Sequence, residues 1–286
     1  MISQPEPSKS PFFLLFKWWN RHFPTFGLLS IASFATAVLS GIVLGIIYNI
    51  HEPVDSLQII QLSIRGGRLF RGVHYWSGQF FLIFTLIHTV EHFLFKTERK
   101  VKSGVWLRLT ISIPFIFFVM LSGFILKGDS EGLLARRILS GLLEVIPATG
   151  NFFKFIVLGK EPDFQIIYLH HIATVTIIIA LVIIEHARRI WPDRLSVIYI
   201  LSGSLLLGIW ALPSLHDGIN PVIKGPWYFL GLQEILHWTT HPIWIPIAAL
   251  IFLIAIYLIP KIQPRSAVRV KQMLLVLLNF YILLSL

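Results

Sequence analysis

Cysteine is absent from the 286 residues of this sequence. Its absence excludes disulfides, thiolate-held iron–sulfur clusters and haem attached covalently through a CxxCH site within the chain. Charged residues are also scarce, at 13% of the chain against about 25% in soluble proteins, whereas 55% of the residues are hydrophobic. This composition is typical of an integral membrane protein.

Acidic residues are few, so the formal net charge is +10. The lysines and arginines lie in the connections between apolar runs and form no long patch. They therefore indicate membrane topology and contact with lipid headgroups, and nucleic-acid binding is not expected.

Six apolar runs have the length and composition of membrane-spanning helices. The sequence predicts them at residues 27–50, 70–95, 105–126, 164–184, 195–212 and 242–259. A final run, 273–286, would extend only about 21 Å as a helix, so a truncated or interfacial helix is expected there. Shorter amphipathic helices are expected to lie in the membrane interface at 11–24, at 133–146 and after Pro226.

The second and fourth runs each carry a matched pair of histidines. His74 and His88 are fourteen residues apart, which brings them within about 40° of one helix face. His171 and His186 are fifteen apart, within about 60° of one face. Histidine is costly inside a membrane and marks a functional site. Two pairs at two depths do not supply the clustered ligands of structural zinc, so bis-histidine haem is the most economical interpretation.

Several neighbouring residues allow two interpretations. Gly27 and Gly41 are also fourteen apart, which suits either close helix packing or room for a flat macrocycle. His170 is expected to be a supporting or loop residue. His92, one turn beyond His88, is interpreted as a polar helix end, with a haem-edge or proton-relay role as the alternative.

Orientation follows from the distribution of basic residues. If the N-terminus is cytoplasmic, fifteen of the 24 lysines and arginines lie on the cytoplasmic side, as the positive-inside rule favours. The second and fourth runs then run parallel. The sequence therefore predicts His74 beside His171 near the outer face and His88 beside His186 near the inner face.

The residues around these histidines resemble a known family. Arg71-x-x-His74-Tyr-Trp-Ser77, with His88 fourteen residues on, resembles the second helix of cytochrome b from quinol–cytochrome c and quinol–plastocyanin oxidoreductases. Three later segments resemble the third helix, the connecting helices and the fourth helix of that family: Ser122-Gly123-Phe124, LSGLLEVIPATG, and 168–186. The fifteen-residue interval is that of the photosynthetic, split form. Pro226-Trp227-Tyr228-Phe229 resembles the loop that carries the family's Pro-Glu-Trp-Tyr motif.

The resemblance implies an all-α polytopic membrane protein of three parts. Residues 1–24 form an interfacial helix, and residues 25–192 form a four-helix transmembrane bundle around two non-covalent b-type haems. Residues 193–286 form a subunit IV-like region with two to three further helices.

The resemblance also implies roles for individual residues. His74 and His171 would ligate the outer haem iron, and His88 and His186 the inner one. The other residues expected at the haems are glycines that make room for the macrocycle and arginines that pair with propionates or, alternatively, with lipid headgroups: Gly27, Gly41, Gly123, Arg68 and Arg71.

The implied function is electron transfer across the bilayer between a quinone or quinol pool and partner redox subunits, in a respiratory or photosynthetic complex. A Rieske-type protein, a multihaem cytochrome or a dehydrogenase subunit would each suit as partner, and the family suggests a dimer. Three alternatives stay open: a di-haem membrane anchor that uses quinone at one face only, a proton- or ion-conducting protein, and a non-redox scaffold.

The sequence departs from the family at the outer quinol site. Pro226 stands where the family has the motif's glutamate, and Lys127-Gly128 stands where it has Pro-Trp after the third helix. Leu109 replaces one glycine of the third helix. Quinol oxidation needs a proton acceptor, so Glu234 and Asp129 are the expected quinol-site carboxylates. The competing interpretation of Glu234 is an exposed residue on an amphipathic helix.

Overall fold

The computed structural model describes residues 11–216 and 223–285, and it contains helices and connections but no strand in those ranges. The helices are α1 (Pro11–His22), α2 (Phe26–Ile47), α3 (Pro53–Leu62), α4 (Gly67–Leu94), α5 (Ser103–Ile125), α6 (Ser130–Glu144), α7 (Gly150–Leu158), α8 (Gln165–Leu169), α9 (Val175–Ala187), α10 (Arg194–Trp210), α11 (Trp227–Trp238), α12 (Trp244–Leu258) and α13 (Pro264–Leu284). A 3₁₀ turn, η1 (Thr97–Lys100), follows α4, and a π turn, η2 (His170–Thr174), joins α8 to α9. The all-α prediction is confirmed.

Four helical segments are long and apolar enough to cross a membrane: α2, α5, the continuous segment Gln165–Ala187, and α13. The apolar helices α10 and α12 are shorter. Helix α4 has 28 residues, about 42 Å, and carries its charged residues near its two ends. The chain is therefore an integral, multi-pass membrane protein.

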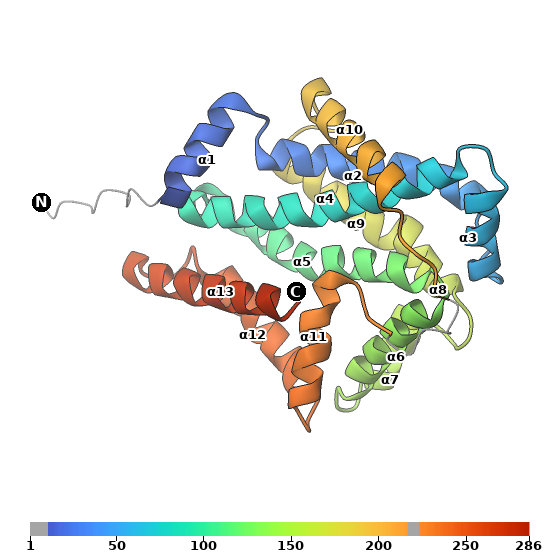
Figure 1. Cartoon of the computed structure of the whole chain (residues 1–286). Helices are drawn as coiled ribbons and strands as arrows, with labels where there is room; N and C mark the ends of the chain where they lie inside the picture. Colours follow the sequence, from blue (N-terminus) through green and yellow to red (C-terminus); the bar gives the residue numbers. More distant parts are fainter. Residues whose placement is uncertain (1–10, 217–222, 286) are drawn as a thin grey trace, which may run out of the picture.

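Helix α4 lies at the centre of the bundle and packs along α2 on one side and α10 on another, while α5 packs along α9 (Figure 1). The α4–α10 crossing depends on glycine, because a Cβ added to Gly72 would lie 2.7 Å from the Cα of Gly208. Small residues allow this approach, and dispersion then stabilises the pair without a hydrophobic driving force in lipid.

The prediction of a short last helix was wrong. Helix α13 begins at Pro264, a favourable first helical residue, and its 21 residues extend about 31 Å. Basic residues in its first half made this stretch look like a loop. One of them, Lys271, is buried, donates to the carbonyl of Phe93 at 2.9 Å and pairs with the buried Glu98.

The short helices that the sequence predicted at 11–24, at 133–146 and after Pro226 correspond to α1, α6 and α11. Helix α6 begins where the Asp129 side chain accepts from the backbone N–H of Gly132 at 3.0 Å, an N-cap that satisfies one unpaired helical donor. Helices α3 and α7 lie in connections for which the sequence predicted only polar or mixed segments.

Candidate functional site

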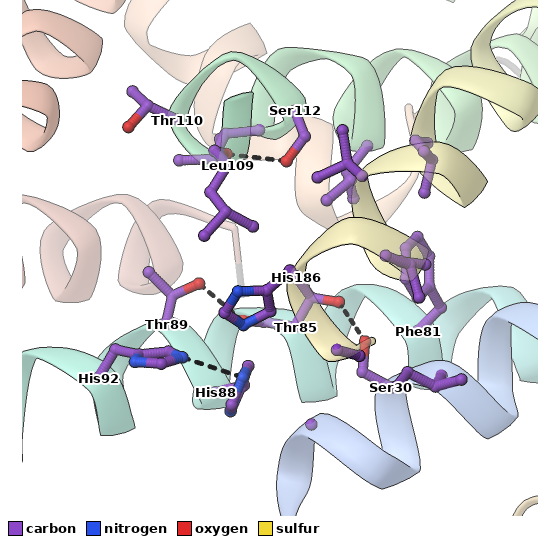
Figure 2. Close-up of a pocket in the computed structure, with 18 of the residues that line it drawn as sticks. Ser30, Phe81, Thr85, His88, Thr89, His92, Leu109, Thr110, Ser112 and His186 are labelled. Carbon is purple, nitrogen blue, oxygen red and sulfur yellow. Dashed lines mark hydrogen bonds between the residues drawn. The ribbon is translucent and has the colours of Figure 1, made fainter. Parts of the chain in front are cut away.

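Two cavities lie inside the bundle. One contains His74 and His171, and the other contains His88 and His186. The His74 cavity has a volume of about 420 Å³, and its lining includes His74, His171, Gly41, Gly123 and Arg71. The His88 cavity has a volume of about 390 Å³, and its lining includes His88, His92, His186, Gly27 and Leu109 (Figure 2). Both are mainly apolar, so each suits a large apolar group with a few fixed polar contacts.

The structure brings the four histidines together in the expected pairs. The ring centroids of His74 and His171 are 6.0 Å apart, and those of His88 and His186 are 6.2 Å apart. Metal–imidazole bonds of about 2 Å place two rings on opposite sides of one ion with centroids roughly 6 Å apart. Each pair is therefore spaced to hold a single metal ion between its rings.

The π turn at His170–Thr174 explains why a fifteen-residue interval in one helix matches a fourteen-residue interval in the other. A π turn takes one more residue than an α turn, so His171 and His186 are related in rotation much as a fourteen-residue pair would be. His170 is not among the described residues that line either cavity, and its Nε2 lies 2.9 Å from the carbonyl of Ile156.

In the His74 cavity both rings are held by backbone carbonyls. Nδ1 of His74 lies 2.9 Å from the carbonyl of Ala37, and Nδ1 of His171 lies 3.0 Å from the carbonyl of Val119. A carbonyl can only accept, so each Nδ1 carries the proton and each Nε2 presents a lone pair. This is the arrangement that orients metal-ligating histidines.

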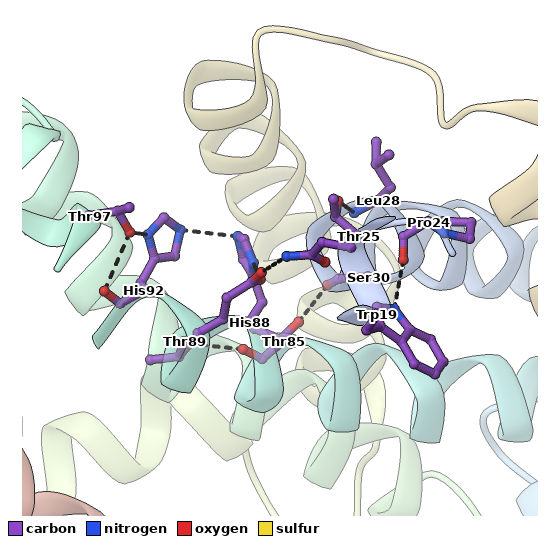
Figure 3. A network of polar contacts seen from close by, with 12 residues as sticks. Trp19, Pro24, Thr25, Leu28, Ser30, Thr85, His88, Thr89, His92 and Thr97 are labelled. Carbon is purple, nitrogen blue, oxygen red and sulfur yellow. Dashed lines mark hydrogen bonds and ion pairs between the residues drawn. The ribbon is translucent and has the colours of Figure 1, made fainter. Parts of the chain in front are cut away.

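In the His88 cavity the corresponding support comes from side chains. Nδ1 of His88 lies 3.1 Å from Glu91 Oε2, and the other oxygen of Glu91 accepts from Asn20 of α1. Nε2 of His92 lies 3.1 Å from Nε2 of His88 (Figures 2 and 3). The interpretation of His92 as a mere helix end is therefore corrected, because His92 lines the cavity.

The glycines lie against the histidine rings. A Cβ added to Gly41 would lie 2.9 Å from Cε1 of His74, one added to Gly123 2.7 Å from Cε1 of His171, and one added to Gly27 3.0 Å from Cε1 of His88. Each of these three glycines thus leaves a space that any side chain would fill. The two histidine pairs and this glycine cradle fit a flat macrocycle ligated on both faces. Leu109 lines the His88 cavity, so the fourth position of the cradle has a bulky side chain (Figure 2).

The two arginines expected near the haem edge lie in different environments. Arg71 is 5% exposed, lines the His74 cavity and donates to Gln61 Oε1. Arg68 is exposed, and in the described part of the chain it is not among the residues that line either cavity.

A group of charged side chains adjoins the His74 cavity. Lys127 lines the cavity, and its Nζ lies 2.9 Å from Asp129 Oδ2 and 2.8 Å from Glu131 Oε2. His216 donates its backbone N–H to Asp129 Oδ2 at 3.0 Å, and its Nδ1 lies 3.2 Å from Glu131 Oε2. The sequence predicted Asp129 but not Glu131 or His216: His216 lies far away in the sequence, and no motif distinguishes Glu131 from an ordinary first-turn acid of α6.

The other expected carboxylate, Glu234, lies elsewhere. It accepts from Trp238 Nε1 at 3.0 Å, faces His237 at 3.4 Å, and has a side chain that is 44% exposed. The start of its helix does reach the His74 cavity, since Pro226 and Tyr228 are part of the lining. Burial raises the pKa of the Tyr228 phenol well above its usual value, so this side chain stays neutral.

Comparisons with known proteins agree with this geometry. The family profile described as cytochrome b/b6/petB matches residues 14–191. The menaquinol:cytochrome c reductase cytochrome b subunit of Bacillus subtilis (strain 168) is 28% identical over 144 residues, which are 48% of this chain and 62% of that protein. Cytochrome b6 of Trichodesmium erythraeum (strain IMS101) is 24% identical over 136 residues, 47% of this chain and 61% of that protein.

The matched segment is thus shorter than two thirds of these relatives. A solved structure described as a hyperthermophilic respiratory Complex III aligns with this chain at a TM-score of 0.67 and 17% sequence identity. The alignment covers 91% of this chain and 89% of the chain in that structure. At that identity the likeness shows the fold alone.

Proposed function

This chain belongs to the cytochrome b/b6/petB family, and from that premise we propose that it is a di-haem membrane subunit that transfers electrons across the bilayer between a quinone pool and partner redox subunits. The observation that carries the proposal is the pair of cavities, each with two facing imidazoles, at opposite ends of one helical bundle. Electron transfer across a membrane needs carriers at two depths, and the bundle offers two such positions.

His74 and His171 would hold one haem and His88 and His186 the other. When bound, b-type haem supplies a one-electron carrier. Imidazole on both faces leaves no open iron position, which favours electron transfer over oxygen chemistry. Gly41 and His74, with Gly27 and His88 in the second cavity, would orient the group.

Arg71 is proposed to pair with a haem propionate of the His74 cavity through a charge-assisted hydrogen bond. Its burial in the cavity wall supports this role. Arg68 stays a weaker proposal for the same role, since its exposed side chain suits lipid headgroups as well.

A quinol site is proposed at the end of the His74 cavity where Pro226 and Tyr228 lie. The proton acceptor would come from the charged group next to Lys127. Asp129 and Glu131 contact the same two neighbours, Lys127 and His216, so the two carboxylates form one hydrogen-bonded group. Asp129 with Glu131 is therefore the preferred acceptor pair, and Glu234 would serve only if α11 shifted toward the cavity.

The wider organisation is proposed on the same basis. Residues 25–192 would form the di-haem domain, flanked by the interfacial segment 1–24 and the subunit IV-like region 193–286. The N-terminus would be cytoplasmic, and the partners would be a Rieske-type protein, a multihaem cytochrome or a dehydrogenase subunit, with a dimer as the assembly unit. Because the chain has no cysteine, single cysteines at the exposed Lys160 and Gln263 test this orientation with a membrane-impermeant thiol reagent. Labelling of Lys160→Cys from outside, and not of Gln263→Cys, is expected, and the reverse would overturn it.

The decisive experiment measures haem in the purified protein. We expect about two haems per chain and a sharp alpha band in the reduced-minus-oxidised spectrum. His171→Ala should remove one haem and leave the other spectrum unchanged. A protein with no haem would support the proton-conducting or scaffold alternatives instead.

A second candidate function is a di-haem anchor that uses quinone at one face only. The replacement of the family's glutamate by Pro226 favours it, because proline has no proton to exchange. Two haems that quinol fails to reduce from the His74 side, while a partner dehydrogenase does reduce them, would establish the anchor.

A further inference from the structure

The His88 cavity contains a third histidine that the pairing does not use. His92 follows His88 by one helical turn, so both project from the same face of α4. The ligand atoms of His88, His92 and His186 all lie within 4.8 Å of one another. Figure 2 shows the three rings converging on the same space.

The His92 ring is oriented as a metal ligand is. Thr97 Oγ1 lies within hydrogen-bond distance of Nδ1 of His92 and 3.4 Å from the carbonyl oxygen of the same residue (Figure 3). This contact fixes the Nδ1 side of the ring, and Nε2 is the nitrogen that faces the cavity, 3.1 Å from Nε2 of His88. Ligating histidines have this kind of support on the ring nitrogen that does not bind the metal.

The distance from His92 to His186 also suits a shared metal. Their ring centroids are 5.6 Å apart, against 6.2 Å for His88 and His186 and 6.0 Å for the pair in the other cavity. His186 is therefore about equally placed to share an iron with either histidine of α4.

Among the described residues that line the His74 cavity there is no third histidine. The residue one turn beyond His74 is Gly78, which lines that cavity, and the residue one turn beyond His171 is Val175. Neither carries a ligating atom. The two cavities are thus a matched pair in which only one holds a third imidazole.

We propose that His92 is an alternative iron ligand opposite His186, so that the His88 cavity can retain its haem through either His88 or His92. The proposal rests on the proposed function, because it takes the metal to be haem iron. It concerns only which histidine of α4 binds.

The test compares four variants of the full-length protein by haem content and by the electron paramagnetic resonance of the ferric haems. His88→Ala should keep about two haems per chain, with a shifted signal from one of them, whereas His88→Ala/His92→Ala should keep about one. His74→Ala, the matched control without a spare ligand, should also keep about one. His92→Ala should keep both.

The signal of the His74-cavity haem reports folding in every variant of the other cavity. If His88→Ala is poorly folded, His88→Gln provides the second variant, because glutamine preserves much of the volume without an imidazole. Loss of one haem in His88→Gln, with the His74-cavity signal intact, would overturn the proposal. A wild-type protein without haem would overturn the proposed function itself, so the two failures are distinguishable.

Discussion

The two cavities each orient a pair of histidine rings, but they do so with different residues. In the His74 cavity both imidazoles contact backbone carbonyls, and each of the two rings lies against a glycine. In the His88 cavity the support comes from Glu91, one glycine is replaced by Leu109, and a third histidine is present.

The surroundings of the cavities differ in the same sense. The His74 cavity adjoins Pro226 and the charged group of Lys127, Asp129, Glu131 and His216, where protons can be exchanged. The His88 cavity adjoins α1 through Asn20 and the end of α4 that Lys271 anchors. We propose that the first cavity supports proton exchange at its edge and that the second permits a change of iron ligand.

The largest expected effect comes from filling the glycine space of the His74 cavity. Gly123→Leu adds a side chain whose first carbon alone would lie 2.7 Å from the His171 ring, so we expect one haem to be lost and the other kept. Overpacking would cost about 1–3 kcal/mol of stability as well. Pyridine haemochrome assay measures the content. Leu109→Gly in the other cavity is the control and should retain both haems; two haems in Gly123→Leu would show that the glycine is a packing residue only.

A large effect confined to the His88 side is expected from Lys271→Met. This change leaves Glu98 buried without its cation, which costs about 3–5 kcal/mol. Since Lys271 also binds the carbonyl of Phe93, next to His92, the haem of the His88 cavity should be released at a lower temperature than the other. Thermal melts followed at both haem signals check this. Glu98→Gln added to Lys271→Met should restore most of the loss, and equal release of both haems would contradict the prediction.

A moderate effect is expected on quinol-driven reduction. Asp129→Asn keeps the N-cap of α6, because asparagine caps as well as aspartate, but removes the carboxylate. General bases contribute about 10²–10⁴-fold, so reduction should slow by about 10-fold or more in Asp129→Asn or Glu131→Gln. Stopped-flow absorbance measures the rate. Glu234→Gln is the matched control, and slowing there alone would move the proton acceptor to α11.

The smallest effect should be a shift in the potential of one haem. Glu91→Gln replaces the carboxylate partner of His88 by a neutral amide, which makes the imidazole a poorer electron donor. The reduction potential of the His88-cavity haem should rise by a few tens of millivolts while that of the other stays unchanged. Potentiometric titration of the two alpha bands separates them, and a shift in both would mean that Glu91 acts on the bundle as a whole.

Local periodicity was enough to predict the helices, the two histidine pairs and their matching depths. These properties depend on residues within one helix, where rotation and rise per residue are constant. It failed where a distant residue changed the balance: α13 was read as too short because Lys271 is neutralised by Glu98, which lies far away in the sequence. His216 was missed for the same reason.

The sequence by itself therefore determined which side chains face inward and at what depth. It also predicted which histidines face each other, because the second and fourth runs are parallel, whereas the tertiary structure decided how closely the rings approach and what else surrounds them. The π turn that aligns His171 with His186, the glycines that lie against the rings, and the position of His92 within reach of His186 all depend on how one helix meets another. Helix faces are set by bonds between near neighbours, whereas the shape of a cavity is set by the packing of segments that the sequence keeps apart.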